Sequence, residues 1–202
     1  MGTDGEGTED AVGEAAGIEA HDGRRAARRD EAVRAAVEQG LLGPDSPVVG
    51  LLDVTGIRES AAALRAAFEA VTAPGTPVLH AFAVKACPLV PVLRLLREEG
   101  IDAEVASPGE LALARAAGLR PEATVLDSPA KTPAELRQAL ALGIAVNADN
   151  PQELERLDAL MRAGGPDGTG GAPAATRRSP LGLRVNPQVG GGSNGATSTP
   201  PP

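Results

Sequence analysis

The sequence predicts an α/β fold with a parallel sheet. Apolar runs of strand length alternate with helical patterns along most of the chain, and the joints between them repeat one design. Successive parallel strands need a crossover between them, usually a helix, and the alternation supplies one each time. A generic α/β domain without special chemistry explains this alternation equally well, so the pattern predicts a fold but no function.

The beginning of the chain differs from the rest. Residues 1–27 are rich in Gly, Glu, Asp and Ala and lack an apolar period, which predicts a disordered arm. A short helix is expected at Arg28–Leu42, because Gly43 and Pro44 follow it. A strand at Pro47–Val54 and a further helix complete a lead segment, residues 28–75, ahead of the main domain.

Five further apolar runs predict the strands of the main domain, residues 76–202. They lie at Val78–Lys85, Ile101–Ser107, Thr124–Ser128, Ile144–Ala148 and Leu181–Asn186. Before the last of them, the Gly/Ala/Pro-rich stretch 163–180 breaks the pattern and predicts a surface loop insertion.

The predicted helix starts share one arrangement. Ser107, Thr132 and Asn150 each precede a proline and stand three residues before a glutamate. The side-chain oxygen caps the first turn, and proline lacks only an N–H that would be unpaired there anyway. The predicted helix ends are at Gly100, Gly118 and Gly143.

Composition excludes several classes of function. The formal net charge of −8 argues against nucleic acid as a partner. No stretch approaches the ~18 consecutive apolar residues of a membrane span, and the N-terminus lacks the order of a secretory signal. We therefore expect a cytoplasmic protein without membrane contact. The single cysteine, Cys87, rules out an internal disulfide.

The basic residues are unevenly chosen, since seventeen are arginine and two, Lys85 and Lys131, are lysine. A neutral lysine attacks a carbonyl group and a guanidinium does not, so each lysine needs an explanation. Lys85 ends a predicted strand, and catalytic side chains of parallel βα barrels sit at the C-terminal ends of strands. Lys85 is therefore a candidate functional residue.

Five short motifs resemble those of one enzyme family. They are Phe82-Ala-Val-Lys-Ala86, Glu104-Val-Ala-Ser-Pro-Gly-Glu110, Ser128-Pro-Ala-Lys-Thr132, Asn147-Ala-Asp-Asn150 and Leu183-Arg-Val-Asn-Pro187. In this order and at compatible spacing, they resemble the fold type III, alanine-racemase-like pyridoxal-phosphate enzymes. The branch they resemble is that of the ornithine, diaminopimelate and arginine decarboxylases. The resemblance covers Val78 to Pro187.

The resemblance implies the N-terminal barrel part of such a decarboxylase. The fold would be a partial (β/α)8 TIM-type barrel with about five of the eight strands. The cofactor would be pyridoxal 5′-phosphate, the substrate an amino acid, and full-length relatives would be homodimers. The strand at Val48–Val54 would belong to a separate C-terminal β-domain. The loop that grips the phosphate and the carboxylate that pairs with the ring nitrogen would lie beyond Pro202.

The resemblance also implies roles for individual residues. Lys85 would be the catalytic residue that forms the internal aldimine with the cofactor. The implied cofactor-binding residues are Lys85, Glu104, Ser107, Glu110 and Arg184. Glu110 fits a helix cap equally well, and Arg184 fits a strand-end ion pair, so these alternatives stay open. Glu104 stands where the family usually has aspartate. No metal site is predicted.

Three interpretations of the function remain. The first is the N-terminal part of a pyridoxal-phosphate-dependent amino-acid decarboxylase, truncated and not active alone. The second is a non-catalytic single-barrel protein that binds pyridoxal phosphate, and the third is an inactive fragment of a disrupted coding sequence. The motifs favour the first, because their pattern is that of the decarboxylases.

Overall fold

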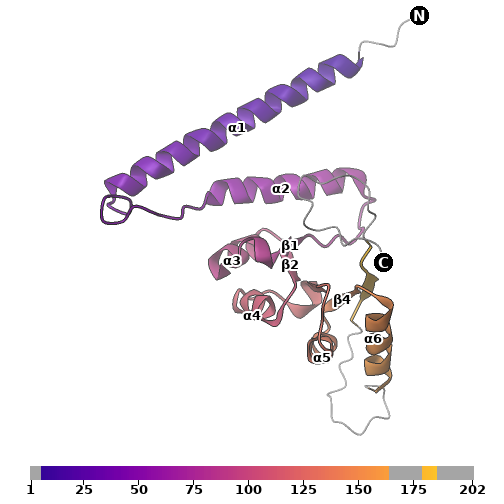
Figure 1. The fold of residues 1–202 in the computed structure, drawn as a ribbon. Coiled ribbons are helices and arrows are strands. Elements are labelled where there is room, and N and C mark those ends of the chain that lie inside the picture. The colour runs from indigo at the N-terminus through magenta and orange to yellow at the C-terminus, as the bar shows by residue number, and fades with distance from the viewer. Residues whose placement is uncertain (1–5, 164–178, 186–202) are drawn as a thin grey trace, which may run out of the picture. The chain divides into compact units, whose positions relative to one another are not determined.

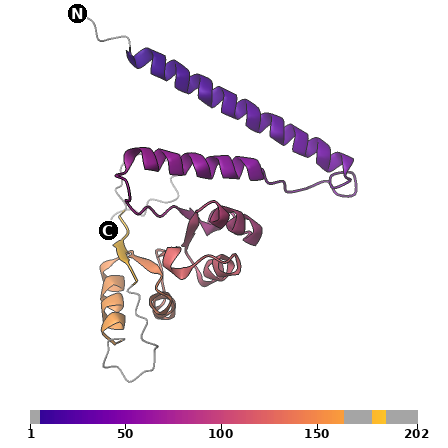
Figure 2. The same cartoon turned by 180° about the vertical axis from the view of Figure 1, so that it is seen from behind.

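The computed structural model describes residues 6–163 and 179–185. The chain divides into two compact units, Met1–Val71 and Thr72–Pro202. Figure 1 labels the helices and strands, and Figure 2 shows them from behind. Each unit is described by itself.

The first unit contains two helices, α1 (Glu6–Glu38) and α2 (Val54–Val71). Helix α1 differs from the prediction of a disordered arm over residues 1–27 and a short helix after it. The prediction relied on the missing apolar period, which reports on packing against a core. Alanine, glutamate and arginine favour a helix by intrinsic propensity without any such packing. Residues 1–5 lie outside the described residues.

The strand predicted at Pro47–Val54 does not form. Residues 47–53 lack regular secondary structure, and α2 begins at Val54. Val48 is 84% exposed, so the apolar run is not buried. A strand forms only where its backbone N–H and C=O groups meet a neighbouring strand. The one bridge nearby joins Gly43 to Ser46 outside the predicted strand.

The second unit contains a five-stranded parallel sheet whose spatial order, β1-β2-β3-β4-β5, is also the order along the chain. Its strands are β1 (Ala81–Ala83), β2 (Asp102–Val105), β3 (Thr124–Asp127), β4 (Ala145–Ala148) and β5 (Leu181–Leu183). Each lies inside a predicted apolar run. The parallel α/β class is confirmed, and the sheet agrees with the predicted partial barrel.

Helices follow one another along the outer side of this sheet, as the two views show. They are α3 (Val90–Glu98), α4 (Pro108–Ala116), α5 (Pro133–Leu142) and α6 (Pro151–Ala163), with short 3-10 turns η1 (Val84–Ala86) and η2 (Pro121–Ala123).

The predicted helix starts and ends are confirmed. Ser107 Oγ accepts a hydrogen bond from the Glu110 amide, and Thr132 forms a complete capping box with Glu135. Asn150 Oδ1 accepts from the Glu153 amide at 2.8 Å. The three predicted terminal glycines have positive φ angles between 74° and 83°: Gly100, Gly118 and Gly143. In that region a side chain would strain the backbone.

The two faces of the sheet differ in burial. Residues on the face toward the helices, which we call the helix face, are buried in the core: Ala103, Val105, Leu126 and Val146. Residues on the opposite face, the open face, are only half-buried: Glu104, Val125, Asp127 and Asn147. The strand register pairs Glu104 with Val125 and Asp127 with Asn147, so these residues share that face. The open face is polar near the C-terminal ends of the strands, the edge that we call the carboxyl edge.

Two further predictions concern the chain as a whole. Among the described residues, no helix is both long enough and apolar enough to cross a membrane. The predicted loop insertion at 163–180 falls almost entirely outside the described residues.

Candidate functional site

The carboxyl edge of the sheet gathers five charged side chains. Because all five strands are parallel, their C-terminal ends meet at one edge. Lys85 follows β1 in turn η1, Glu104 lies in β2, and Asp127 ends β3. Asp149 and Arg184 directly follow β4 and β5. The edge thus brings together two cations and three carboxylates.

Lys85 presents its amine on the accessible side of this edge. Its side chain is 63% exposed, and Nζ lies 3.8 Å from Glu104 Oε1. The backbone beneath it is fixed, because Val84 in the same turn is fully buried in the core. The structure therefore combines a rigid base with an amine that a ligand can reach.

Glu104 has a raised pKa at this edge. Burial raises its pKa above the ordinary value for glutamate, and the neighbouring charges of Asp127 and Glu110 raise it further. Lys85 and Arg184 act in the opposite direction. A carboxyl group with a raised pKa beside an amine is suited to holding and releasing a proton.

Arg184 lies between two carboxylates. Its Nη1 donates to Asp149 Oδ1 at 3.2 Å, and its Nε lies 3.8 Å from Asp127 Oδ1. The strand-end ion pair left open by the sequence is therefore present. Asp127 Oδ1 is buried and has no hydrogen bond from the described residues, although the Arg184 charge is close. A buried oxygen of this kind is a place for a donor on a ligand.

The sequence prediction missed Asp127 and Asp149. Asp127 lies near the C-terminal end of a predicted strand and Asp149 directly follows another, and the position at a strand end is what selected Lys85. Applied to every strand rather than to the rare lysines alone, the rule would have found them.

Ser107 and Glu110 lie next to this edge but are engaged in the cap of α4. Ser107 Oγ accepts from the Glu110 amide, and Glu110 Oε2 accepts from the Ala106 amide at 3.0 Å. These contacts support the capping alternative for Glu110. They shape the loop between β2 and α4, directly after Glu104.

Lys131 differs from Lys85 in burial and in its contacts. Its side chain is 1% exposed, and Nζ lies 2.7 Å from Glu153 Oε2, which is also buried. Nζ also donates to the Ser128 carbonyl oxygen at 2.6 Å. The Lys131 side chain therefore connects two loops from the inside, and its amine is not accessible to a ligand.

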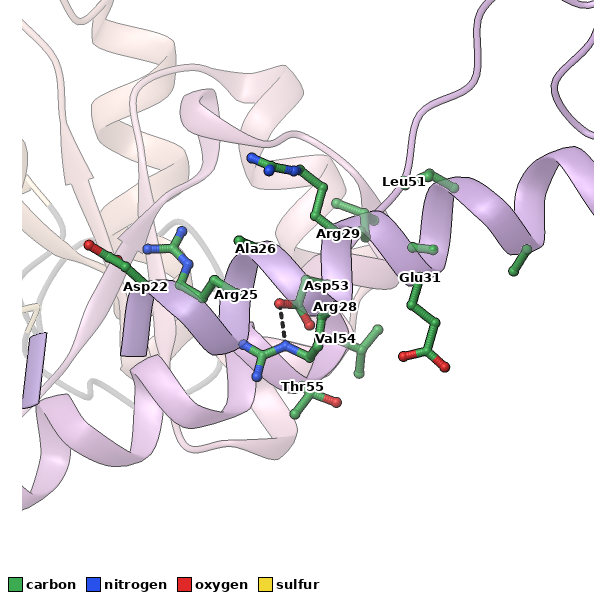
Figure 3. Close-up of a pocket in the computed structure, with 13 residues that line it drawn as sticks. Asp22, Arg25, Ala26, Arg28, Arg29, Glu31, Leu51, Asp53, Val54 and Thr55 are labelled. Atoms are coloured by element: carbon green, nitrogen blue, oxygen red, sulfur yellow. Dashed lines mark hydrogen bonds and ion pairs between the residues drawn. The ribbon is translucent and has the colours of Figure 1, made fainter. Parts of the chain in front are cut away.

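The first unit contains a cavity of about 720 Å³ between α1 and residues 51–55. Figure 3 shows Arg28 reaching Asp53 across it, and Arg28 also contacts Glu59 at 3.1 Å. Hydrogen bonds from the Gly56 amide and then Arg28 lower the pKa of Asp53. Lysine, cysteine and histidine are absent from its described lining, and no cluster of three metal-ligating side chains occurs among the described residues. The described lining of this cavity therefore lacks a nucleophilic amine like that of Lys85 at the carboxyl edge.

Comparison with known families gives one extended match. The family model described as "Pyridoxal-dependent decarboxylase, pyridoxal binding domain" matches residues 56–200. This range includes the whole sheet and all five charged residues of its carboxyl edge.

Curated relatives with similar sequences are diaminopimelate decarboxylases. The enzyme from Streptomyces coelicolor is 37% identical over 122 residues, which cover 58% of this chain and 24% of that protein. The enzyme from Actinosynnema pretiosum is 39% identical over 111 residues, 54% of this chain and 24% of that protein. The matched part is thus about a quarter of these relatives' length.

A solved structure with a similar fold is the lysine/ornithine decarboxylase of Vibrio vulnificus in complex with putrescine. The match has a TM-score of 0.52 and 32% sequence identity, and it covers 64% of this chain and 32% of that one. The two chains therefore share the fold of the sheet and its helices.

Proposed function

Because the chain belongs to the pyridoxal-dependent decarboxylases, through their pyridoxal-binding domain, we propose that it holds pyridoxal phosphate covalently on Lys85. The exposed Lys85 amine at the carboxyl edge of the sheet carries this proposal. The other lysine of the chain is sealed in an ion pair, so one lysine side chain is open to an aldehyde.

The residues at the edge fit the chemistry of this cofactor. Pyridoxal phosphate carries an aldehyde, and the Lys85 amine is the nucleophile that such a group needs. Its ring bears polar groups, and Asp127 Oδ1, on a residue of the open face, accepts no hydrogen bond from the described residues. Within the described part of the chain, the ion pairs of Arg184 are to two carboxylates. We therefore propose that Arg184 orients these carboxylates rather than gripping the phosphate.

The chain's own residues would prepare Lys85 for reaction. The amine attacks only when it is neutral, and Glu104 Oε1 is near enough, at 3.8 Å from Nζ, to take up the proton through a small movement or one water. The raised pKa of Glu104 favours that transfer. Ser107 and Glu110 fix the loop that follows Glu104. When bound, pyridoxal phosphate supplies an electron sink for the pair left behind as carbon dioxide departs.

Covalent labelling tests the assignment directly. The chain is incubated with pyridoxal phosphate, reduced with borohydride and digested, and the labelled peptide is identified by mass spectrometry. We expect the label on Lys85, and its loss in Lys85→Arg, which keeps the charge but not the nucleophile. Lys131→Arg removes the other lysine of the chain, and the labelled peptide of this variant should still be the one that contains Lys85. Label found mainly on Lys131 or on the N-terminal amine would sink the proposal.

We further propose that the substrate of the complete enzyme is an amino acid and that this 202-residue chain does not turn it over unaided. Decarboxylation requires the substrate to be held so that the breaking bond aligns with the cofactor ring. Among the described residues, the side chains of the open face at this edge are only partly buried. Carbon dioxide release is measured with lysine, ornithine, arginine and diaminopimelate. Turnover by the chain alone, abolished by Lys85→Ala, would contradict this part of the proposal. Homodimers and a cytoplasmic location belong to the same proposal for the complete enzyme.

A further inference from the structure

The buried ammonium group of Lys131 joins two loops at the carboxyl edge of the sheet. Nζ donates to the carbonyl oxygen of Ser128, the residue directly after Asp127. Nζ also contacts Glu153 Oε2, and that oxygen accepts a hydrogen bond from the Asp149 amide at 2.9 Å. One charged atom therefore ties the residue after Asp127 to the backbone of Asp149.

Asp127, which directly precedes Ser128, and Asp149 carry the two carboxylates that contact Arg184. Asp149 Oδ1 accepts from Nη1 at 3.2 Å, and Asp127 Oδ1 lies 3.8 Å from Nε. The distance between the carboxylates decides whether one guanidinium group reaches both. Strand pairing fixes the backbone of Asp127 beside Asn147, and the Lys131 contact adds a second tie between β3 and β4 just beyond that pair.

Helix capping does not explain the buried lysine. Three glutamates occupy equivalent positions at the starts of α4, α5 and α6, namely Glu110, Glu135 and Glu153, and each accepts from a backbone amide. Of these, Glu153 is the one that is buried and paired with lysine. Glu135 caps α5 at a half-exposed position, where the charge of Lys131 acts on it but no ion-pair contact within 4 Å is present among the described residues.

Stability alone does not explain it either. Desolvating two charges offsets much of their attraction, and apolar replacements of buried ion pairs are often neutral or stabilising. A chain that uses arginine at seventeen of its nineteen basic positions keeps a lysine here. A compact ammonium group with three donors meets a carbonyl and a carboxylate at one point, and a planar guanidinium does not.

We propose that Lys131 is a positioning residue that sets the spacing of Asp127 and Asp149 and thereby holds Arg184 in place beside the Lys85 site. The geometric part of this inference stands without a cofactor. Its consequence for pyridoxal phosphate binding rests on the function proposed above.

The test measures the reactivity of Arg184 in the full chain without cofactor. Phenylglyoxal modifies guanidinium groups, and peptide mass spectrometry gives the rate at each arginine. The variant Lys131→Met/Glu153→Gln removes both charges together, so no unpaired charge is buried, while the amide oxygen still accepts from Asp149. We expect modification of Arg184 to rise roughly fivefold, the scale of a pairwise coupling between neighbouring groups. Asp149→Asn, which removes a carboxylate from Arg184 directly, should give a rise of similar size.

Two controls separate positioning from general loosening. Glu135→Gln removes the matched capping carboxylate of α5 and should leave the Arg184 rate unchanged. Arg97 donates to the Gly118 carbonyl oxygen, away from the edge, and its rate should stay constant in every variant. An unchanged Arg184 rate in the folded double variant, or an equal rise at Arg97, would overturn the inference.

A second variant covers the case in which the double variant does not fold. Lys131→Arg keeps the positive charge but changes the shape that joins the two loops. Arg184 should again react faster, whereas an unchanged rate would count against positioning. With cofactor, Arg184→Ala should weaken pyridoxal phosphate binding in the wild type but add little in the double variant. If Lys85 takes no label while Arg184 responds as expected, the proposed function fails and the positioning role survives.

Discussion

The two faces of the five-stranded sheet are built from the same short strands, yet they serve different ends. The helix face is lined by small and branched apolar residues such as Val105 and Val146, which are buried against the helices. The open face carries Glu104 and Asp127, which are half-buried. The pKa of Glu104 is raised, and Asp127 Oδ1 accepts no hydrogen bond from the described residues. Because successive side chains of a strand point to opposite faces, the residues that stabilise the fold lie on one face of the sheet and the polar residues lie on the other. Substitutions on the two sides should differ accordingly.

The largest contrast is expected between the two lysines. Lys131→Ala leaves Glu153 buried without its partner and should lower the free energy of unfolding by about 3–5 kcal/mol. Lys85→Ala removes an exposed side chain and should change it by no more than about 0.5 kcal/mol. Urea unfolding followed by circular dichroism measures both values. Equal losses would show that Lys85 is also part of the structural framework.

Core truncation on the helix side should rank second. Leu136 in α5 is fully buried in the core, so Leu136→Ala should reduce the free energy of unfolding by about 2–5 kcal/mol through lost burial and a cavity. Val125→Ala on the open face should cost clearly less, because Val125 is only half-buried. The same urea titration compares the two variants, and a larger loss at Val125 would mean that the open face is covered in solution.

A smaller effect is expected where helix α5 begins. Thr132→Ala removes the side chain that accepts from the Glu135 amide at 3.2 Å and should cost about 1 kcal/mol. Thr132→Ser keeps the accepting oxygen and should stay close to the wild type. The pair of thermal melts would contradict the capping assignment if both variants lost the same amount.

The smallest effect is a change in pH dependence at Glu104. Burial raises the pKa of this carboxyl group, so its ionised form opposes folding. The penalty is absent below the unfolded pKa of the group and complete above its higher folded pKa. Glu104→Gln should therefore stabilise the chain at neutral pH, and the difference from the wild type should shrink as acid protonates the carboxyl group. Urea midpoints measured across this range check the sign, and a gain that persists in acid would contradict it.

The sequence predicted the sheet and its caps because both depend on local patterns. An apolar run, a capping side chain and a terminal glycine act within a few residues, and Thr132 with Gly143 delimits α5 as expected. The position of Lys85 followed from the same logic. Asp127 and Asp149 escaped because carboxylates at strand ends are common, and their shared contact with Arg184 exists only in three dimensions.

The two differences at the N-terminal side have the opposite cause. The run Pro47–Val54 has the composition of a strand, but composition does not supply a neighbouring strand. Helix α1 makes its backbone hydrogen bonds within itself, so it forms without an apolar period in its sequence. A local sequence pattern therefore predicts a helix, whose backbone hydrogen bonds are internal, better than a strand, whose backbone hydrogen bonds require a neighbouring strand.

The strictly sequential strand order has a consequence for biosynthesis. Each strand pairs with the strand that the ribosome has just released, from β1 at Ala81 to β4 at Ala145, with one helix between successive strands. A pairing between strands that are neighbours in sequence closes a shorter loop, at a lower entropic cost, than a pairing between distant strands. The sheet can therefore grow during translation, one βα unit at a time, and Lys85 follows β1, the first strand of this sheet in chain order. The amine that we assign to the cofactor emerges before the other four charged residues of the edge, and Arg184 is the last of the five to be made.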